Sequence, residues 1–172
     1  MLRLAGAVDP EEAAQRAFEG SPAVTDDEAM DLALAEARAA RATGDVPVGA
    51  VVLDAQGTVL ATGRNEREAR HDPTAHAEIV AIRRAADALG TWRLDGTRLV
   101  VTLEPCAMCA GAILSSRVSR VVFGAWDDKA GAAGSVYDLL RDRRLPQRAE
   151  VVGGVREAES AALLTEFFDQ QR

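Results

Sequence analysis

The stretch RLVVTLEPCAMCAGAILS, residues 98–115, joins a continuous apolar run to a segment that opens with a proline and two cysteines. The run Arg98–Leu103 is typical of a strand buried on both faces of a sheet. A helix is predicted over Cys106–Ser115, with Pro105 at its first position, so that both thiols lie in the first turn. Residues three apart share a helix face, so the thiols point the same way. The positive end of the helix dipole favours thiolate there, which is the form that binds metal.

Strands and helices alternate on either side of this stretch. A helix is expected from Thr25, which forms a capping box with Glu28, to Gly44. The other expected elements are a hairpin of Val48–Leu53 and Val59–Thr62, a helix Thr74–Leu89, a strand Arg120–Gly124, a short helix near Val136–Leu140, a strand Glu150–Val152 and a last helix Glu157–Gln170. This alternation indicates an α/β layered domain.

Length and composition indicate one globular domain. The chain has 172 residues, of which 48% are hydrophobic, enough for a real core. Apolar runs fall short of the roughly 18 residues that a membrane helix needs. The N-terminus does not resemble a signal peptide and two cysteines cannot build a disulfide framework, so a cytoplasmic protein is expected. Residues 1–24 are predicted to form an acidic mobile extension, and residues 25–172 a single domain.

The acidic charge is concentrated at the start of the chain. Residues 1–28 hold seven acids and two bases, a net charge of −5, which leaves 20 acids and 18 bases, a net of −2, in residues 29–172. The total of −7 argues against non-specific binding of nucleic acid, but the near balance of the body leaves room for a local basic surface. The candidates for phosphate contacts are Arg64, Arg67 and Arg70, and, with a solvated turn as an equal alternative, Arg141, Arg143, Arg144 and Arg148.

His76 and Glu78 form the second chemical feature. A helix cap at Asp72 or Thr74, with Pro73 in the first turn, would place His76 near a helix N-terminus as well. One histidine and two cysteines, Cys106 and Cys109, give three protein ligands and leave a position for water. That is the pattern of a catalytic zinc site, although iron is not ruled out.

The catalytic interpretation gives Glu78 a separate task. Zinc lowers the pKa of a bound water to around 7, and Glu78 could take its proton and pass it to a substrate without being a ligand. The alternatives are a redox pair of cysteines and a solvated carboxylate on a helix.

An H-x-E motif followed by P-C-x-x-C is the signature of the zinc nucleobase deaminases. From about Ala29 to the C-terminus, the chain resembles the bacterial tRNA-specific adenosine deaminases. The resemblance lies in DVPVGAV at 45–51, HDPTAHAE at 71–78, LEPCAMCAGA at 103–112, RVVFGA at 120–125 with Asp127, Lys129 and GAAGS at 131–135, and Ala161–Leu164 with Phe167 and Phe168. The most discriminating piece is RVVFGA at 120–125 followed by Asp127, Lys129 and GAAGS at 131–135, because deaminases of free bases usually lack that loop.

The resemblance implies a cytidine deaminase-like fold, a three-layer α/β arrangement with a mixed five-stranded sheet and helices on both faces. It also implies one Zn²⁺ per subunit and a homodimer. The implied reaction is hydrolytic deamination of adenosine to inosine at the wobble position of a tRNA anticodon, chiefly in an arginine tRNA, with the anticodon stem-loop as partner. The alternatives are a deaminase of a free base such as guanine or cytosine, and a zinc-stabilised or redox binding module without turnover.

Four residues are candidates for substrate binding. Asn65 matches a substrate-pocket position of the family, and its amide could both donate and accept; otherwise it caps a turn. Asp127 could accept from a ribose hydroxyl or cap a local turn. Phe167 and Phe168 are adjacent, so one is expected in the core and the other free to stack on a base, with both in the core as the alternative.

Three further positions near these motifs carry weaker expectations. Trp126 stands where the family pattern suggests a basic or small residue. His71 and Glu104 are expected to pack or hydrogen-bond, with Glu104 at the entrance of the cysteine helix, rather than take part in the chemistry.

Overall fold

The computed structural model describes residues 23–171. The expectation of an extension over residues 1–24 therefore falls almost entirely outside the described residues. Val24, at the start of the described part, packs against the apolar layer beneath the first helix. Within the described range, no helix is both long and apolar enough to cross a membrane.

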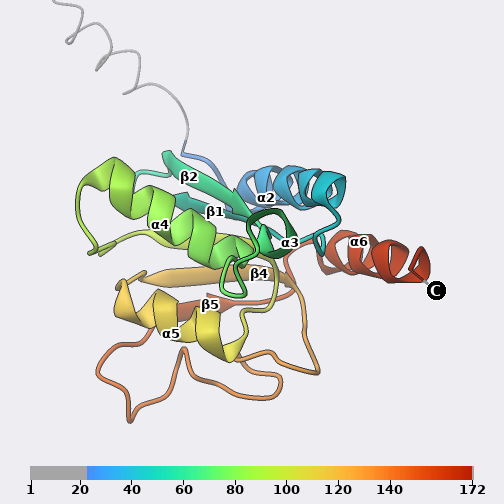
Figure 1. Ribbon diagram of the computed structural model, residues 1–172. Helices are drawn as coiled ribbons and strands as arrows, with labels where there is room; N and C mark the ends of the chain where they lie inside the picture. Colours follow the sequence, from blue (N-terminus) through green and yellow to red (C-terminus); the bar gives the residue numbers. More distant parts are fainter. Residues whose placement is uncertain (1–22, 172) are drawn as a thin grey trace, which may run out of the picture.

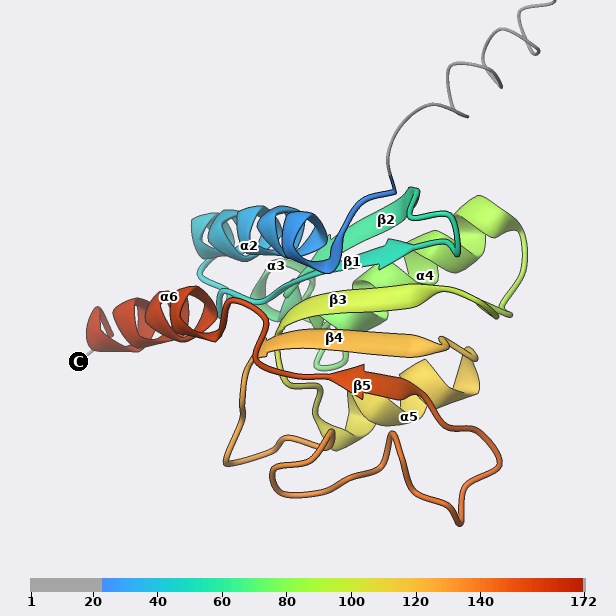
Figure 2. The same cartoon turned by 180° about the vertical axis from the view of Figure 1, so that it is seen from behind.

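Five strands form one mixed sheet, as the sequence predicts (Figures 1 and 2). In chain order they are β1 Gly49–Leu53, β2 Val59–Arg64, β3 Arg98–Leu103, β4 Arg120–Ala125 and β5 Glu150–Val152. Their order across the sheet is β2-β1-β3-β4-β5. β1 is antiparallel to both β2 and β3, whereas β3, β4 and β5 run parallel.

Helices cover both faces of the sheet and complete three layers. α2 (Asp26–Ala40) and α6 (Glu157–Asp169) share one face, and α4 (Ala77–Leu89) and α5 (Ala107–Ser115) share the other (Figures 1 and 2). The short elements η1 (Arg41–Thr43) and α3 (Arg67–Arg70) lie in the connections.

Alternate residues of each central strand point into two separate apolar cores. In β3, Leu99 and Val101 pack with α4 and α5, whereas Val100 packs with α2 and α6. In β4, Val121 and Phe123 face the first core and Val122 the second. Both faces of these strands are thus buried, which is why their sequences read as continuous apolar runs.

The two helices at the chemical motifs begin later than the sequence suggested. α4 begins at Ala77, with His76 as its N-cap, so the expected start at Thr74 with a cap at Asp72 or Thr74 is wrong. Asp72 instead closes a local turn, because its Oδ1 accepts from Thr74 N at 2.8 Å and from Thr74 Oγ1 at 2.7 Å.

α5 likewise begins at Ala107 with Cys106 as its N-cap, so Pro105 precedes the helix instead of occupying its first position. The Pro105 carbonyl accepts from Ala132 N at 2.7 Å, which keeps this residue in an extended connection.

The segment 126–149 contains no helix, so the helix expected near Val136–Leu140 is wrong. Backbone pairing within the segment takes its place: Ala133 forms a bridge with Asp138, and Leu139 N donates to Ala132 O at 2.9 Å. The single turn α3 had no counterpart in the sequence prediction.

The capping box of α2 can be tested by removing one hydroxyl. Thr25 Oγ1 accepts from Glu28 N at 3.2 Å, and the Glu28 carboxylate accepts from Thr25 N at 2.8 Å. We expect Thr25→Ala to lower the free energy of unfolding by about 1 kcal/mol in urea titrations, because Glu28 N loses its acceptor. Thr25→Ser keeps the hydroxyl and should stay close to the parent protein; equal losses in both variants would contradict the cap.

Candidate metal centre and substrate pocket

The N-termini of α4 and α5 bring the three expected metal ligands together. His76 and Cys106 are the N-cap residues of the two helices, and Cys109 is the third residue of α5. His76 Nδ1 lies 3.5 Å from Cys109 Sγ and 3.7 Å from Cys106 Sγ. All three potential ligand atoms lie within 4.8 Å of one another.

The electrostatics of this cluster favour one thiolate even in the bare protein. The pKa of Cys106 is lowered to about 3, because the Cys109 thiol donates to it and His76 lies beside it. The same hydrogen bond, together with burial, raises the pKa of Cys109, and the contact with Cys106 raises the pKa of His76. Two sulfurs and an imidazole, one sulfur already anionic, are the donor set that suits zinc. The residues present therefore fit the metal.

Glu78 lies beside this cluster in the first turn of α4. Its side chain is only 4% exposed, so the solvated carboxylate of the alternative interpretation is not what the structure shows. Burial raises the pKa of Glu78 to about 7. A carboxyl group with a pKa near neutrality can both accept and release a proton under physiological conditions.

A cavity of about 160 Å³ opens next to these groups. It is lined by Val46, Val48, Asn65, Arg67, His76, Ala77, Glu78, Leu103, Glu104, Cys106, Asp127 and Ala130. The structure thus brings two of the expected substrate residues, Asn65 and Asp127, to the same pocket as Glu78.

Asn65 is held by a long-range contact rather than by a local turn. It is 7% exposed, and its Nδ2 donates to Val46 O at 3.3 Å. Its Oδ1 is buried and has no hydrogen-bond partner in the described part of the chain. A buried acceptor without a partner costs free energy, which a donor on a ligand in the pocket would relieve.

Asp127 caps a local turn, as one of its two expected roles requires. Its Oδ1 accepts from Lys129 N at 3.0 Å and from Ala130 N at 3.2 Å, which is a local turn cap. It also lines the pocket.

Phe167 and Phe168 lie outside this pocket, in a neighbouring hollow of about 140 Å³. The two hollows share Val46, Asn65 and Arg67 in their walls. Phe167 is 8% exposed and Phe168 is 49% exposed, so one ring is in the core and the other is available, as the sequence predicts.

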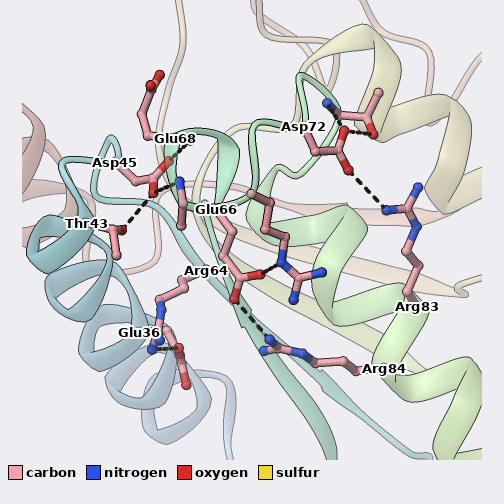
Figure 3. A network of polar contacts seen from close by, with 12 residues as sticks. Glu36, Thr43, Asp45, Arg64, Glu66, Glu68, Asp72, Arg83 and Arg84 are labelled. Atoms are coloured by element: carbon pink, nitrogen blue, oxygen red, sulfur yellow. Dashed lines mark hydrogen bonds and ion pairs between the residues drawn. The ribbon is translucent and has the colours of Figure 1, made fainter.

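One of the three residues shared by the two hollows, Arg67, begins α3, which the sequence did not predict. The helix is capped from outside by Asp45, a fully buried residue whose carboxylate accepts from Glu68 N at 2.8 Å and Ala69 N at 3.2 Å (Figure 3). Thr43 Oγ1 donates to the same carboxylate at 2.7 Å. A buried aspartate close to the β1 motif is the only signal that could have indicated such a capped turn.

Of the three arginines expected near the pocket, two are engaged by carboxylates. Arg64 pairs with Glu36 at 3.3 Å (Figure 3), and Arg70 pairs with Glu66. Arg67 makes no ion pair with any residue of the range 23–171 and lines both hollows. In the second basic group, Arg141 pairs with Asp138 and Arg144 with Asp142, which agrees with the solvated-turn alternative.

Glu104 is more deeply buried and more extensively hydrogen-bonded than the sequence suggested. It is 2% exposed, and its carboxylate accepts from the backbone N–H groups of Asp127, Ala133 and Ser135. Burial raises its pKa, but these hydrogen bonds outweigh burial and hold the pKa of Glu104 below its usual range. The expected hydrogen-bonding role at the entrance of the cysteine helix is confirmed, and the partners are backbone groups of the segment 127–135.

Trp126 contacts an aromatic residue of its own chain, whereas His71 is exposed, so the packing expected of His71 is wrong. The Trp126 ring meets Phe123 edge-on, with centroids 4.8 Å apart. His71 ends α3 in the left-handed conformation and is absent from both hollows.

Comparison with known proteins decides the family. Residues 23–125 match the cytidine and deoxycytidylate deaminase zinc-binding region. The chain is 48% identical over 143 residues to the tRNA-specific adenosine deaminase of Bacillus subtilis (strain 168), covering 83% of this chain and 88% of that relative. The chain belongs to the tRNA-specific adenosine deaminase family. It is accordingly a zinc-dependent hydrolytic deaminase, and neither a redox protein nor a binding module without turnover.

Solved structures agree with the expected cytidine deaminase-like fold. One, from a study of A-to-I editing by tRNA A34 deaminases at the wobble position, superposes with a TM-score of 0.76 at 45% identity and covers 79% of this chain and 98% of its own. A guanine deaminase from Nitrosomonas europaea superposes with a TM-score of 0.74 at 26% identity, covering 96% of each chain.

Removal of one sulfur should remove metal and stability together. In Cys109→Ala the cluster loses one of three donors, so we expect less than one zinc per chain by mass spectrometry. Its thermal unfolding midpoint should fall to that of the parent protein treated with chelator, because bound metal stabilises the folded state. Met108→Ala, an exposed position between the two cysteines, should keep its zinc. A full zinc content in Cys109→Ala would contradict this ligand set.

Proposed function

We propose that this protein converts adenosine to inosine at the wobble position of a tRNA anticodon, chiefly in an arginine tRNA, in the cytoplasm. The observation that carries the proposal is the pocket in which Glu78 and Asn65 meet the cluster of His76, Cys106 and Cys109. The 48% identity to a tRNA-specific adenosine deaminase supports this substrate.

In this proposal, His76 Nδ1 and the sulfurs of Cys106 and Cys109 hold one zinc ion. When bound, zinc supplies a water that is deprotonated near neutral pH. The three protein donors leave room for that water. The low pKa of Cys106 reduces the cost of presenting an anionic sulfur to the metal.

Glu78 moves the protons of the reaction. Water adds to the carbon that bears the exocyclic amine, and the C–N bond breaks, so that adenosine and water give inosine and ammonia. Glu78 takes a proton from the water and delivers it to the ring nitrogen. It then delivers a proton to the departing ammonia. Its buried position beside the cluster suits this task because no bulk water competes for the proton.

The remaining pocket residues place the base and its neighbours. A base in an anticodon loop is unpaired, which lowers the cost of turning it into the pocket. We assign the free Oδ1 of Asn65 to the base or its ribose, and Asp127 to a ribose hydroxyl. The exposed Phe168, backed by Phe167, would stack on an adjacent base in the second hollow.

The assembly proposed is a homodimer. Large apolar side chains, among them Val136, Tyr137 and Leu145, are exposed along the segment 126–149. Exposed apolar groups gathered on one segment are typical of a surface that a second subunit covers.

The decisive experiment measures inosine in a purified arginine tRNA that carries a wobble adenosine. We expect the native protein to form inosine and Glu78→Ala to lose at least about 10²-fold in rate while keeping its zinc, since a positioned acid–base group is removed. Asp87→Asn changes an exposed carboxylate on the same helix and should be fully active. A different outcome would contradict the tRNA assignment: a folded, zinc-loaded protein forms no inosine but releases ammonia from guanine or cytosine. The protein would then be a deaminase of a free base.

Asn65→Ala should weaken binding of the substrate more than it weakens binding of the metal. We expect kcat/KM for the tRNA to fall about tenfold or more, because a buried hydrogen-bonding partner of the substrate is lost. Gln56→Ala, in the hairpin turn at the other end of β1, is the matched control and should leave kcat/KM unchanged. An unaltered value in Asn65→Ala would remove this residue from the binding site.

A further inference from the structure

Glu104 uses both of its carboxylate oxygens on one backbone segment. Oε1 accepts from Ala133 N at 2.9 Å and from Ser135 N at 3.1 Å. Oε2 accepts from Asp127 N at 3.0 Å. Hydrogen bonds to an ionised acceptor are about twice as strong as neutral ones, so this carboxylate is a strong attachment point for residues 127–135.

The same segment fits closely against Glu104 and the residues after it. Gly131 forms a bridge with Cys106, and Ala132 N donates to Pro105 O at 2.7 Å. A Cβ added to Gly131 would lie 2.3 Å from Glu104 Oε2, nearer than atoms can approach. The segment can therefore lie against the carboxylate only because residue 131 has no side chain.

We infer that Glu104 is a positioning residue for the tRNA substrate: it holds residues 127–135 in the conformation that presents Asp127 to the pocket before the substrate arrives. The inference rests on the proposed function. Glu104 lines the pocket, but its oxygens are already engaged by three N–H groups, so it is not a second acid–base group beside Glu78.

A positioning role has a distinct kinetic consequence. If only a fraction of molecules has the segment in place, the apparent affinity for substrate falls by that fraction. Once substrate is bound the segment is in place, so the rate at saturation is preserved. Loss of Glu104 should thus appear in KM, whereas a merely structural role would reduce the amount of active protein and appear in kcat.

Glu104→Gln is the primary test. The amide keeps one acceptor oxygen, which can serve Ala133 and Ser135, but its NH₂ group then faces the N–H of Asp127. We expect KM for the arginine tRNA to rise about tenfold, as for the loss of one hydrogen bond to a charged group, with kcat within about twofold and the zinc content unchanged. Amide hydrogen exchange should accelerate in residues 127–135 and remain unchanged in α5.

Asp54→Asn supplies a matched control. Asp54 Oδ1 also accepts from two backbone N–H groups, those of Gln56 and Thr58, but it follows β1 at the end remote from the pocket-lining Val48. We expect neither KM nor the exchange of residues 127–135 to change in this variant.

Gly131→Ala tests the contact between Glu104 and the segment 127–135 by changing the segment instead of the carboxylate. It is the deciding variant if Glu104→Gln does not fold. It leaves the carboxylate in the chain but forces the segment away from it, so the same rise in KM is expected. An unchanged KM in either folded variant, or a fall in kcat with KM unchanged, would overturn the inference. If the parent protein forms no inosine, the proposed function fails, and hydrogen exchange alone then decides whether Glu104 holds the segment.

Discussion

The meeting of two helix N-termini at one end of the sheet is the constraint on which the site depends. α4 and α5 pack side by side on one face, and each begins with a residue of the metal cluster as its N-cap. In this arrangement the cluster receives the positive ends of two helix dipoles, which favour thiolate at Cys106. The same packing buries Glu78 in the first turn of α4, so the feature that collects the metal ligands also raises the pKa of the neighbouring carboxyl group.

Three buried carboxylates beside the two hollows differ in how their burial is compensated. Asp45 and Glu104 each accept from backbone N–H groups, through which Asp45 holds the short helix α3 and Glu104 holds the segment 127–135. Glu78 lacks comparable compensation for burial, and its pKa rises to about 7. The hydrogen bonds of Glu104 hold its pKa below the usual range and make it a rigid anchor, whereas the poorly compensated Glu78 exchanges its proton near neutral pH. Two of the carboxylates therefore fix chain segments beside the hollows, and the third, Glu78, can accept and release a proton.

Short-range patterns predicted the strands and the main helices, because apolar runs are local properties. The metal cluster joins residues 30 positions apart, and it was predicted from the chemistry of one histidine and two cysteines in their motifs. The errors arise where distant residues decide. The start of α5 and the absence of a helix near Val136–Leu140 depend on the segment 126–149 pairing with Pro105 and with Glu104, the latter 29 residues before Ala133. α3 depends on Asp45, 23 residues before Glu68. Asn65 was found through family resemblance, and its unpaired Oδ1 became visible only in three dimensions.

The fold itself does not select the substrate, since a guanine deaminase superposes on this chain with a TM-score of 0.74 at 26% identity. Selection must therefore come from the walls of the pocket. The second hollow shares a wall with the first and contains the exposed Phe168 and Arg67, which forms no ion pair within residues 23–171. A free base would occupy the first hollow and leave the second without a ligand. A polynucleotide offers a further base for the aromatic ring and a phosphate for the arginine, so the pair of hollows favours a target base that arrives as part of a strand.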